Sequence, residues 1–402
     1  MGGSPDIVPI AVATVVCSGV LNAFYFRLMG KVCETTQAET YRQAWERTVG
    51  VESSPWVNMI VTAKTALSCL AFSMIIADSG QALAQAAGLV DITRTEALLG
   101  VTGIVLLPLT LQRDLSSLAP FSFVGVLGVL ITTATIAIRY QDGSYLMETG
   151  TFAQDLPTQL QPHFVDSTNS VAAVTASDVL TNSATAGTFG SWSGVVLSCT
   201  LATAYVAHYN APRFFNELQD SSVERFQKVT YASYAVAAVL FVVVGCCGFL
   251  TFGQASQGYI LNNYSPTDPL ANFCKAALTG SILCTYPLPF VGLRDGCLDL
   301  LDVSDRDQVH AVTTVALLSI ITMGALLVSD LGLVLSVGGG TFSTAVSAVF
   351  PVCMFLAMDS DNKSIVEQIA AGLGMLFSVS IGVAGVSIAL GKAAATAAAV
   401  ST

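Results

Sequence analysis

Ten apolar runs, each separated from the next by a polar segment, recur along this chain of 402 residues. An α-helix that crosses the hydrocarbon core of a bilayer needs about 20 predominantly apolar residues. The runs reach or approach this length, with approximate ends at 7–29, 56–77, 97–111, 117–138, 192–219, 229–253, 268–291, 309–329, 331–357 and 366–390. We therefore expect an all-α membrane protein of about ten transmembrane helices, in a single transmembrane domain over residues 1–402.

The composition supports a membrane protein and excludes other classes. Hydrophobic residues make up 53% of the chain and charged residues 11%, against about a quarter charged in soluble proteins. A soluble chain of this size would need a far larger polar surface, so the lipid bilayer is the expected partner. The formal net charge of −11 argues against a nucleic-acid partner.

No catalytic or cofactor-binding motif stands out. The ten cysteines are scattered, mostly inside apolar runs and without a CxxC pair, which favours small hydrophobic side chains over a disulfide or zinc framework. His163, His208 and His310 lie in different regions, and no HExxH motif occurs. The glycine-rich segment 338–347 lacks the P-loop lysine, so we interpret it as helix packing. We expect neither an enzyme nor a cofactor.

Lys and Arg are enriched in cytoplasmic loops of membrane proteins, and this bias favours a non-cytoplasmic N-terminus. That orientation puts eleven basic residues on the cytoplasmic side: Arg27, Lys31, Arg42, Arg47, Arg113, Arg213, Arg225, Lys228, Arg294, Arg306 and Lys363. Four face away (Arg94, Arg139, Lys275 and Lys392), and Lys64 lies within a span. The polar segment 140–190 then becomes an extracellular or lumenal loop, which we expect to be flexible. Asn263-Tyr-Ser265 faces the same side and is a candidate glycosylation site, weakened by the following Pro266.

The run 192–219 differs from the others because His208, Tyr209, Asn210 and Pro212 interrupt it. Proline disfavours helix at the preceding residue and suits the first turn of a new helix. One interpretation is a half-helix 193–203, an irregular stretch 204–211 and a second half-helix from Pro212; such broken helices form the binding sites of many secondary transporters. The alternative is that the span ends near Val206 and that His208 lies in the headgroup region.

Five segments, in order, resemble the amino acid/auxin permease family, in the branch of sodium-coupled neutral and vacuolar amino acid transporters. They are Thr40–Trp45, Leu107–Ser122, Val206–Pro212 with Phe215–Leu218, Gly248–Gly253, and Cys284–Leu288, and the likeness runs from about residue 8 to 390. The resemblance implies a five-plus-five inverted-repeat transporter fold, with 192–219 as the broken helix of the second repeat. The family's first helix, a glycine-rich broken span, has no counterpart in this sequence.

The resemblance also implies roles for individual residues. The broken segment makes Tyr205, His208, Tyr209 and Asn210 candidate substrate-binding residues. Thr285, in the pattern Thr-x-Pro, matches the family position whose hydroxyl is thought to coordinate sodium, and Ser281 lies four residues earlier on the same helical face. The alternative for Thr285 is a hydroxyl bonded to the carbonyl four residues earlier. Lys64 either extends to the cytoplasmic interface or forms an internal ion pair or stands in for a cation.

The function expected is secondary active transport of neutral amino acids, coupled to sodium or protons, with alternating access about the break at 204–211. The other possibility is a non-transporting nutrient sensor or scaffold on the same fold, or an inactive truncated product, which the missing first helix suggests. A multi-pass protein of the vacuolar, lysosomal or plasma membrane fits this expectation. The sequence does not indicate the amino acid carried or the oligomeric state.

Overall fold

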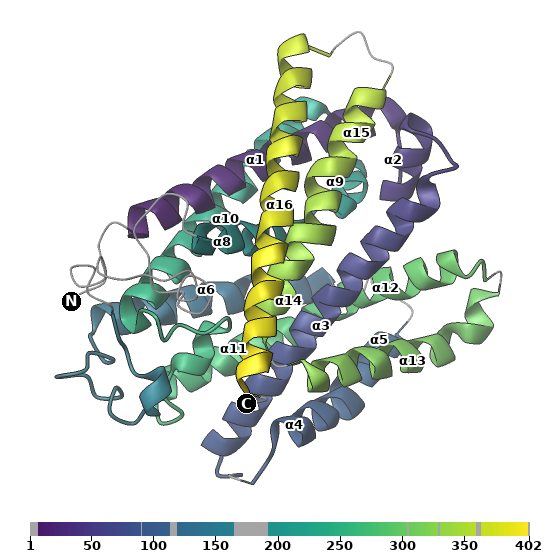
Figure 1. The fold of residues 1–402 in the computed structure, drawn as a ribbon. Coiled ribbons are helices and arrows are strands. Elements are labelled where there is room, and N and C mark those ends of the chain that lie inside the picture. Colours follow the sequence, from purple (N-terminus) through teal and green to yellow (C-terminus); the bar gives the residue numbers. More distant parts are fainter. Residues whose placement is uncertain are drawn as a thin grey trace. The chain divides into compact units, whose positions relative to one another are not determined.

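The described part of the protein is almost entirely helical. The computed structural model describes residues 7–89, 91–112, 119–164, 192–303, 305–328, 330–358 and 363–400 (Figure 1). Within them, nine helical segments are long and apolar enough to cross a membrane: Val8–Thr36, Ser54–Ala86, Arg94–Leu111, Phe123–Gln141, Val223–Phe252, Pro269–Leu300, Arg306–Leu327, Leu331–Ala357 and Ile365–Gly391. The expected class, a multi-pass helical membrane protein, is confirmed.

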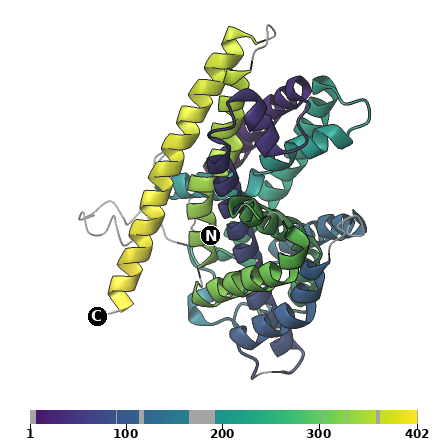
Figure 2. The same cartoon turned by 90° about the vertical axis from the view of Figure 1, so that its right-hand side faces the viewer.

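The surface of these helices fits a lipid solvent. The long helix α16 (Ile365–Val400), drawn in yellow in Figure 2, exposes Ile369, Leu373, Phe377 and Val383 along its length. In water such a row of apolar side chains would drive association. In a bilayer it faces acyl chains at no cost.

The expected span 192–219, the one run not among these nine segments, is interrupted, as the broken-helix interpretation predicts. Helix α8 (Trp192–Tyr205) ends before a non-helical pair of residues; a 3-10 turn, η4 (His208–Asn210), follows, and α9 (Ala211–Glu217) begins directly after it. Pro212 occupies the first turn of α9, where its missing N–H is not needed. The helix therefore extends two residues beyond the expected end at 203, and the irregular stretch is shorter than predicted.

The described residues pack into two compact units. The first unit comprises Thr65–Asp166 and Val243–Val334. It holds most of α3 (Ser54–Ala86), then α4 (Arg94–Val101), the π-helical turn η1 (Thr102–Leu106), α5 (Leu107–Leu111), α6 (Ala119–Gln141), η3 (Thr158–Leu160), the end of α10 (Val223–Phe252), η5 (Ile260–Asn263), α11 (Pro269–Thr285), α12 (Pro287–Leu300) and α13 (Arg306–Leu327). The main packing is α11 against α6.

The second unit comprises Ser4–Lys64, Ser167–Val242 and Leu335–Thr402. Its described elements are α1 (Ile7–Thr36), α2 (Tyr41–Thr48), the start of α3, α8, η4, α9, most of α10, the end of α14 (Leu331–Gly338), the π-helical turns η6 (Gly339–Ser343) and η7 (Ala345–Val349), α15 (Phe350–Ala357) and α16. Helix α1 contacts α8, α9 and α15, and α16 contacts α8 and α15. These contacts position the broken segment.

Two expectations about the polar regions are wrong. The part of the loop 140–190 that the structure describes, up to residue 164, is not a loose loop, because Tyr145, Ala153 and Leu156 are buried and Tyr145 hydrogen-bonds Asp268; residues 165–190 lie outside the described residues. Asn263 is fully buried, and its amide bonds the backbone of Ala255 and Gln257. A glycan cannot be attached there in the folded protein.

Candidate functional site

Tyr205 ends helix α8 and fixes it against two other helices of its unit. Its hydroxyl donates to the carbonyl of Val15 on α1 at 3.2 Å. Its own carbonyl accepts a hydrogen bond from the Tyr234 hydroxyl of α10 at 3.0 Å, and the two tyrosine rings stack. The carbonyl that the break leaves without a helical partner is therefore satisfied by a side chain, as an interrupted membrane helix requires.

His208 is the most enclosed of the predicted substrate-binding residues, with 0% of its surface exposed. Its Nε2 lies 3.1 Å from the backbone carbonyl of Asn22 on α1. The edge of the ring meets Phe26, with centroids 5.2 Å apart, and Tyr234 lies at 6.5 Å. His208 is thus a buried residue inside its unit.

Tyr209 and Asn210 are half-buried and complete the 3-10 turn. The ammonium group of Lys64 lies over the Tyr209 ring, 4.4 Å from its centroid. Lys64 is itself buried at 6% exposure, so it does not extend to water as the first alternative proposed. Asn210 precedes α9, and its backbone N–H bonds the carbonyl of Ala207 at 2.9 Å. The Lys64 side chain therefore contacts the turn directly.

The glycine-rich turn η6 packs against α8 and α16. A Cβ on Gly339 would lie 1.7 Å from the carbonyl oxygen of Cys199, and one on Gly382 of α16 would lie 2.4 Å from that of Gly340. The Thr203 hydroxyl donates to the carbonyl of Leu335 at 2.9 Å. The packing role predicted for segment 338–347 is confirmed, because only glycine allows these backbones to approach.

The predicted cation ligands, Thr285 and Ser281, belong to the other unit. They lie on the face of α11 that packs against α6, where a Cβ on Gly128 would come within 2.5 Å of the Ser281 side chain. The Thr285 hydroxyl donates to the carbonyls of Ser281 and Ile282, at 3.0 and 3.2 Å, and the Ser281 hydroxyl donates to the carbonyl of Gly125 at 3.1 Å. Both protons are used, but each oxygen keeps lone pairs. The cation role stays a prediction.

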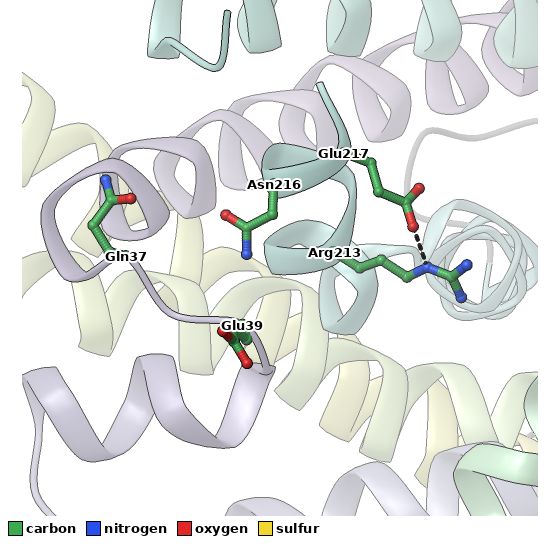
Figure 3. Close-up of a pocket in the computed structure, with 5 residues that line it drawn as sticks. All are labelled: Gln37, Glu39, Arg213, Asn216 and Glu217. Atoms are coloured by element: carbon green, nitrogen blue, oxygen red, sulfur yellow. Dashed lines mark hydrogen bonds and ion pairs between the residues drawn. The ribbon is translucent and has the colours of Figure 1, made fainter. Parts of the chain in front are cut away.

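A polar recess opens beside α9 (Figure 3). Its volume is about 520 Å³, and Gln37, Glu39, Arg213, Asn216 and Glu217 line it. Arg213 and Glu217 pair with each other at 2.8 Å, and both are about 60% exposed. Because water screens exposed charges, this recess offers a zwitterion little binding free energy, and we do not assign the substrate site to it.

Two residues of the candidate site were missed by the motif analysis. Asn22 supplies the carbonyl that His208 contacts, and Tyr234 holds the end of α8. A signal for Asn22 was present, because a lone asparagine inside the apolar run 7–29 is expected to face other helices rather than lipid. Tyr234 gives no comparable signal, since a tyrosine in an apolar run is equally expected at the membrane interface.

The fold and the interrupted helix agree with comparisons to known proteins. The family model described as "Transmembrane amino acid transporter protein" matches residues 8–394. The chain belongs to this family of membrane transporters.

Individual relatives are distant. "Putative sodium-coupled neutral amino acid transporter 11" of Bos taurus is 21% identical over 368 residues, which is 90% of this chain and 72% of that protein. "Vacuolar amino acid transporter 2" of Saccharomyces cerevisiae is 24% identical over 70% of this chain and 54% of its own length. "Sodium-coupled neutral amino acid transporter 7" of Mus musculus is 23% identical over 83% of this chain and 69% of its own length. The chain thus spans about half to three quarters of the length of these relatives.

Proposed function

We propose that the protein is a secondary active transporter of neutral amino acids, coupled to sodium or protons, that works by alternating access about the break between α8 and α9. The observation that carries the proposal is the interruption of this span at the buried residue His208. Family membership supplies the class of transporter. The names of the mouse and yeast relatives refer to a sodium-coupled neutral and a vacuolar amino acid transporter.

The chemistry of the break suits an amino acid. A zwitterion entering a bilayer must exchange its hydration for hydrogen bonds and opposite charge inside the protein. The turn contains the buried His208, the buried Tyr205 ends α8 just before it, and the ammonium of Lys64 lies on the ring of Tyr209. This positive charge would attract the carboxylate of the substrate, while carbonyl and amide oxygens suit its ammonium.

The break also provides a hinge. Ala207 has backbone angles of −133° and 0°, outside the helical range, and separates α8 from the 3-10 turn. A few residues at the end of an element can absorb the angular change of a domain or half-helix motion. We expect α9 to move about residues 206 and 207 while α8 stays packed on η6.

Uptake into proteoliposomes tests the function. Purified protein would be supplied with radiolabelled L-alanine, L-leucine and L-glutamine under an inward sodium gradient, an inward proton gradient, or neither. We expect accumulation with one of the gradients and its loss when an ionophore dissipates that gradient. Binding of an amino acid without accumulation under either gradient would overturn the proposal and favour the sensor or scaffold. Localisation of the tagged protein would separate vacuolar or lysosomal from plasma membranes.

A further inference from the structure

Asn22 on α1 and His208 in η4 form a buried polar contact inside the second unit. Their exposed fractions are 7% and 0%, and His208 Nε2 lies 3.1 Å from the Asn22 backbone oxygen. The Asn22 amide nitrogen donates to the carbonyl of Ser18 at 2.9 Å. The contact joins residues 186 positions apart, so it exists only in the folded protein.

These two hydrogen bonds fix which atoms carry protons. A backbone carbonyl can only accept, so Nε2 of His208 must be protonated. Full burial disfavours a second proton on the ring, which makes Nδ1 an acceptor. For the same reason the Asn22 nitrogen must point to Ser18, which leaves Oδ1 as the free end of the amide. Neither His208 Nδ1 nor Asn22 Oδ1 has a hydrogen-bond partner among the residues that the structure describes, and both atoms are buried.

Two buried acceptors without donors are unfavourable unless a bound group supplies the donors. The surroundings indicate what that group is. Lone pairs repel a carboxylate, so the bound group must present hydrogen-bond donors. A primary ammonium carries a positive charge and three N–H donors, which is the chemistry that two buried acceptors require.

We propose that Asn22 Oδ1 and His208 Nδ1 bind the ammonium group of the amino-acid substrate. This inference rests on the proposed function and extends it to a residue of α1 that no motif indicated. The substrate ammonium then lies against α1 and the start of η4. The substrate carboxylate points toward the Lys64 side chain, which lies on the ring of Tyr209, the residue after His208. Such a site selects primary amines and rejects fully N-methylated ones, which have no N–H to donate.

The substitution Asn22→Leu tests the site because it keeps the side-chain size and removes the acceptor. Binding of radiolabelled L-leucine and L-glutamine to the purified protein would be competed with each amino acid and with its N,N,N-trimethyl derivative. We expect wild-type protein to reject the trimethyl compounds. The variant should bind the amino acids about 10- to 100-fold more weakly, which corresponds to about 1.4 to 2.8 kcal/mol, and should lose most of its preference for the primary amine.

Melting temperatures measured without amino acid separate binding from folding. Leucine removes a buried acceptor that lacks a donor, so the melting temperature of the variant should be unchanged or higher. Thr14→Val is the matched control on α1, because the Thr14 hydroxyl donates to Ile10 in its own helix; it should change neither affinity nor amine preference.

Three results would overturn the inference. The first is wild-type affinity and amine preference in Asn22→Leu, and the second is a loss of affinity that accompanies a lower melting temperature. The third is an altered pH dependence of binding with the amine preference intact, because the two acceptors would then bind a proton instead of the substrate. Wild-type protein that binds none of the amino acids would instead refute the proposed function.

Discussion

Buried charged side chains of this protein each contact a specific partner. In the first unit, Asp268 is fully buried and accepts from Arg139 at 2.6 and 2.9 Å and from the Tyr145 hydroxyl at 3.0 Å. It also caps α11 through the backbone N–H groups of Leu270 and Ala271. Burial raises the pKa of Tyr145 above its usual range, and the nearby Asp268 carboxylate raises it further, so the phenol stays a donor.

Asp268→Asn should destabilise the protein. It removes one partner of a buried ion pair, and we expect the free energy of unfolding to fall by about 3 kcal/mol. This value is at the low end for such changes, because Arg139 still pairs with Asp142. Thermal unfolding in detergent would measure it. Glu224→Gln is the control, since its pair with Lys228 is exposed, and it should leave the melting temperature unchanged. Equal melting temperatures for both variants would contradict the structural role of Asp268.

His208→Ala should lower amino-acid uptake about 10-fold or more with the amount of protein in the membrane preserved, because it removes a hydrogen bond to a charged substrate. Asn210→Ala should have a smaller effect, since Asn210 is only half-buried. His163→Ala provides the matched control, as His163 is exposed in the other unit. Normal uptake by His208→Ala at several substrate concentrations would remove His208 from the site.

Thr285→Ala should weaken the dependence of uptake on the coupling ion far more than it weakens substrate affinity at saturating ion. The hydroxyl oxygen is a suitable ligand for a hard cation, and Thr285→Ser keeps it and should behave nearly as wild type. Uptake as a function of sodium concentration or pH measures the effect. An alanine variant with unaltered ion dependence would show that the Thr285 hydroxyl does not bind the ion and serves only its hydrogen bond to the Ser281 carbonyl.

At the scale of the elements, the helices are interrupted at a buried polar turn, at a proline and where glycines allow close packing. The α8–α9 span breaks at a buried polar turn, and α11 gives way to α12 at Tyr286, directly before Pro287. The π-helical turn η6 lies where Gly339 and Gly340 approach α8 and α16. π-turns inside helices are often found at functional sites, and here η6 packs directly against α8.

Gly382→Ala should lower the stability of the second unit by about 1–3 kcal/mol, the usual cost of overpacking. The added Cβ would lie 2.4 Å from the backbone oxygen of Gly340, which has little freedom to move. Gly372→Ala in the same helix has no atom within 4 Å of the new Cβ, so it should be neutral or slightly stabilising. Melting curves of the two variants in one detergent make the comparison. Similar curves would show that η6 and α16 can separate without cost.

For the whole molecule, the basic residues determine the orientation in the membrane. The bias of eleven to four predicts that the connection between α1 and α2 is cytoplasmic and that the segment after α6 is extracellular or lumenal. Both connections contain exposed residues, Glu39 and Glu148.

Single cysteines at these positions would test the orientation. In a Cys17→Ser background, which lacks the exposed native thiol, a membrane-impermeant maleimide should label Glu148→Cys from the outer or lumenal face. It should label Glu39→Cys from the cytoplasmic face alone. The parent protein without an added cysteine controls for the native thiols. Labelling of both positions from one face would contradict the topology.

Much of the architecture could be predicted from the sequence because it depends on local properties. The length of each apolar run predicted the spans, and Pro212 with the polar residues before it predicted the break to within two residues. The flexible loop predicted from composition was wrong for residues 142–164, where the Tyr145 hydroxyl bonds the buried Asp268. The sequon at Asn263 failed for the same reason, because a short motif does not reveal burial.

The sequence by itself determined that this is a membrane protein, which segments are long and apolar enough to cross the bilayer, and where one of them breaks. It could do so because the length of an apolar run and the effect of proline are local properties of the chain. Only the tertiary structure decided which polar atoms meet. Asn22 and His208 are 186 positions apart, Arg139 and Asp268 are 129 apart, and Lys64 reaches Tyr209 from another helix. In an apolar interior each polar group needs a specific partner, and that partner is fixed by how the helices pack, which no single segment encodes.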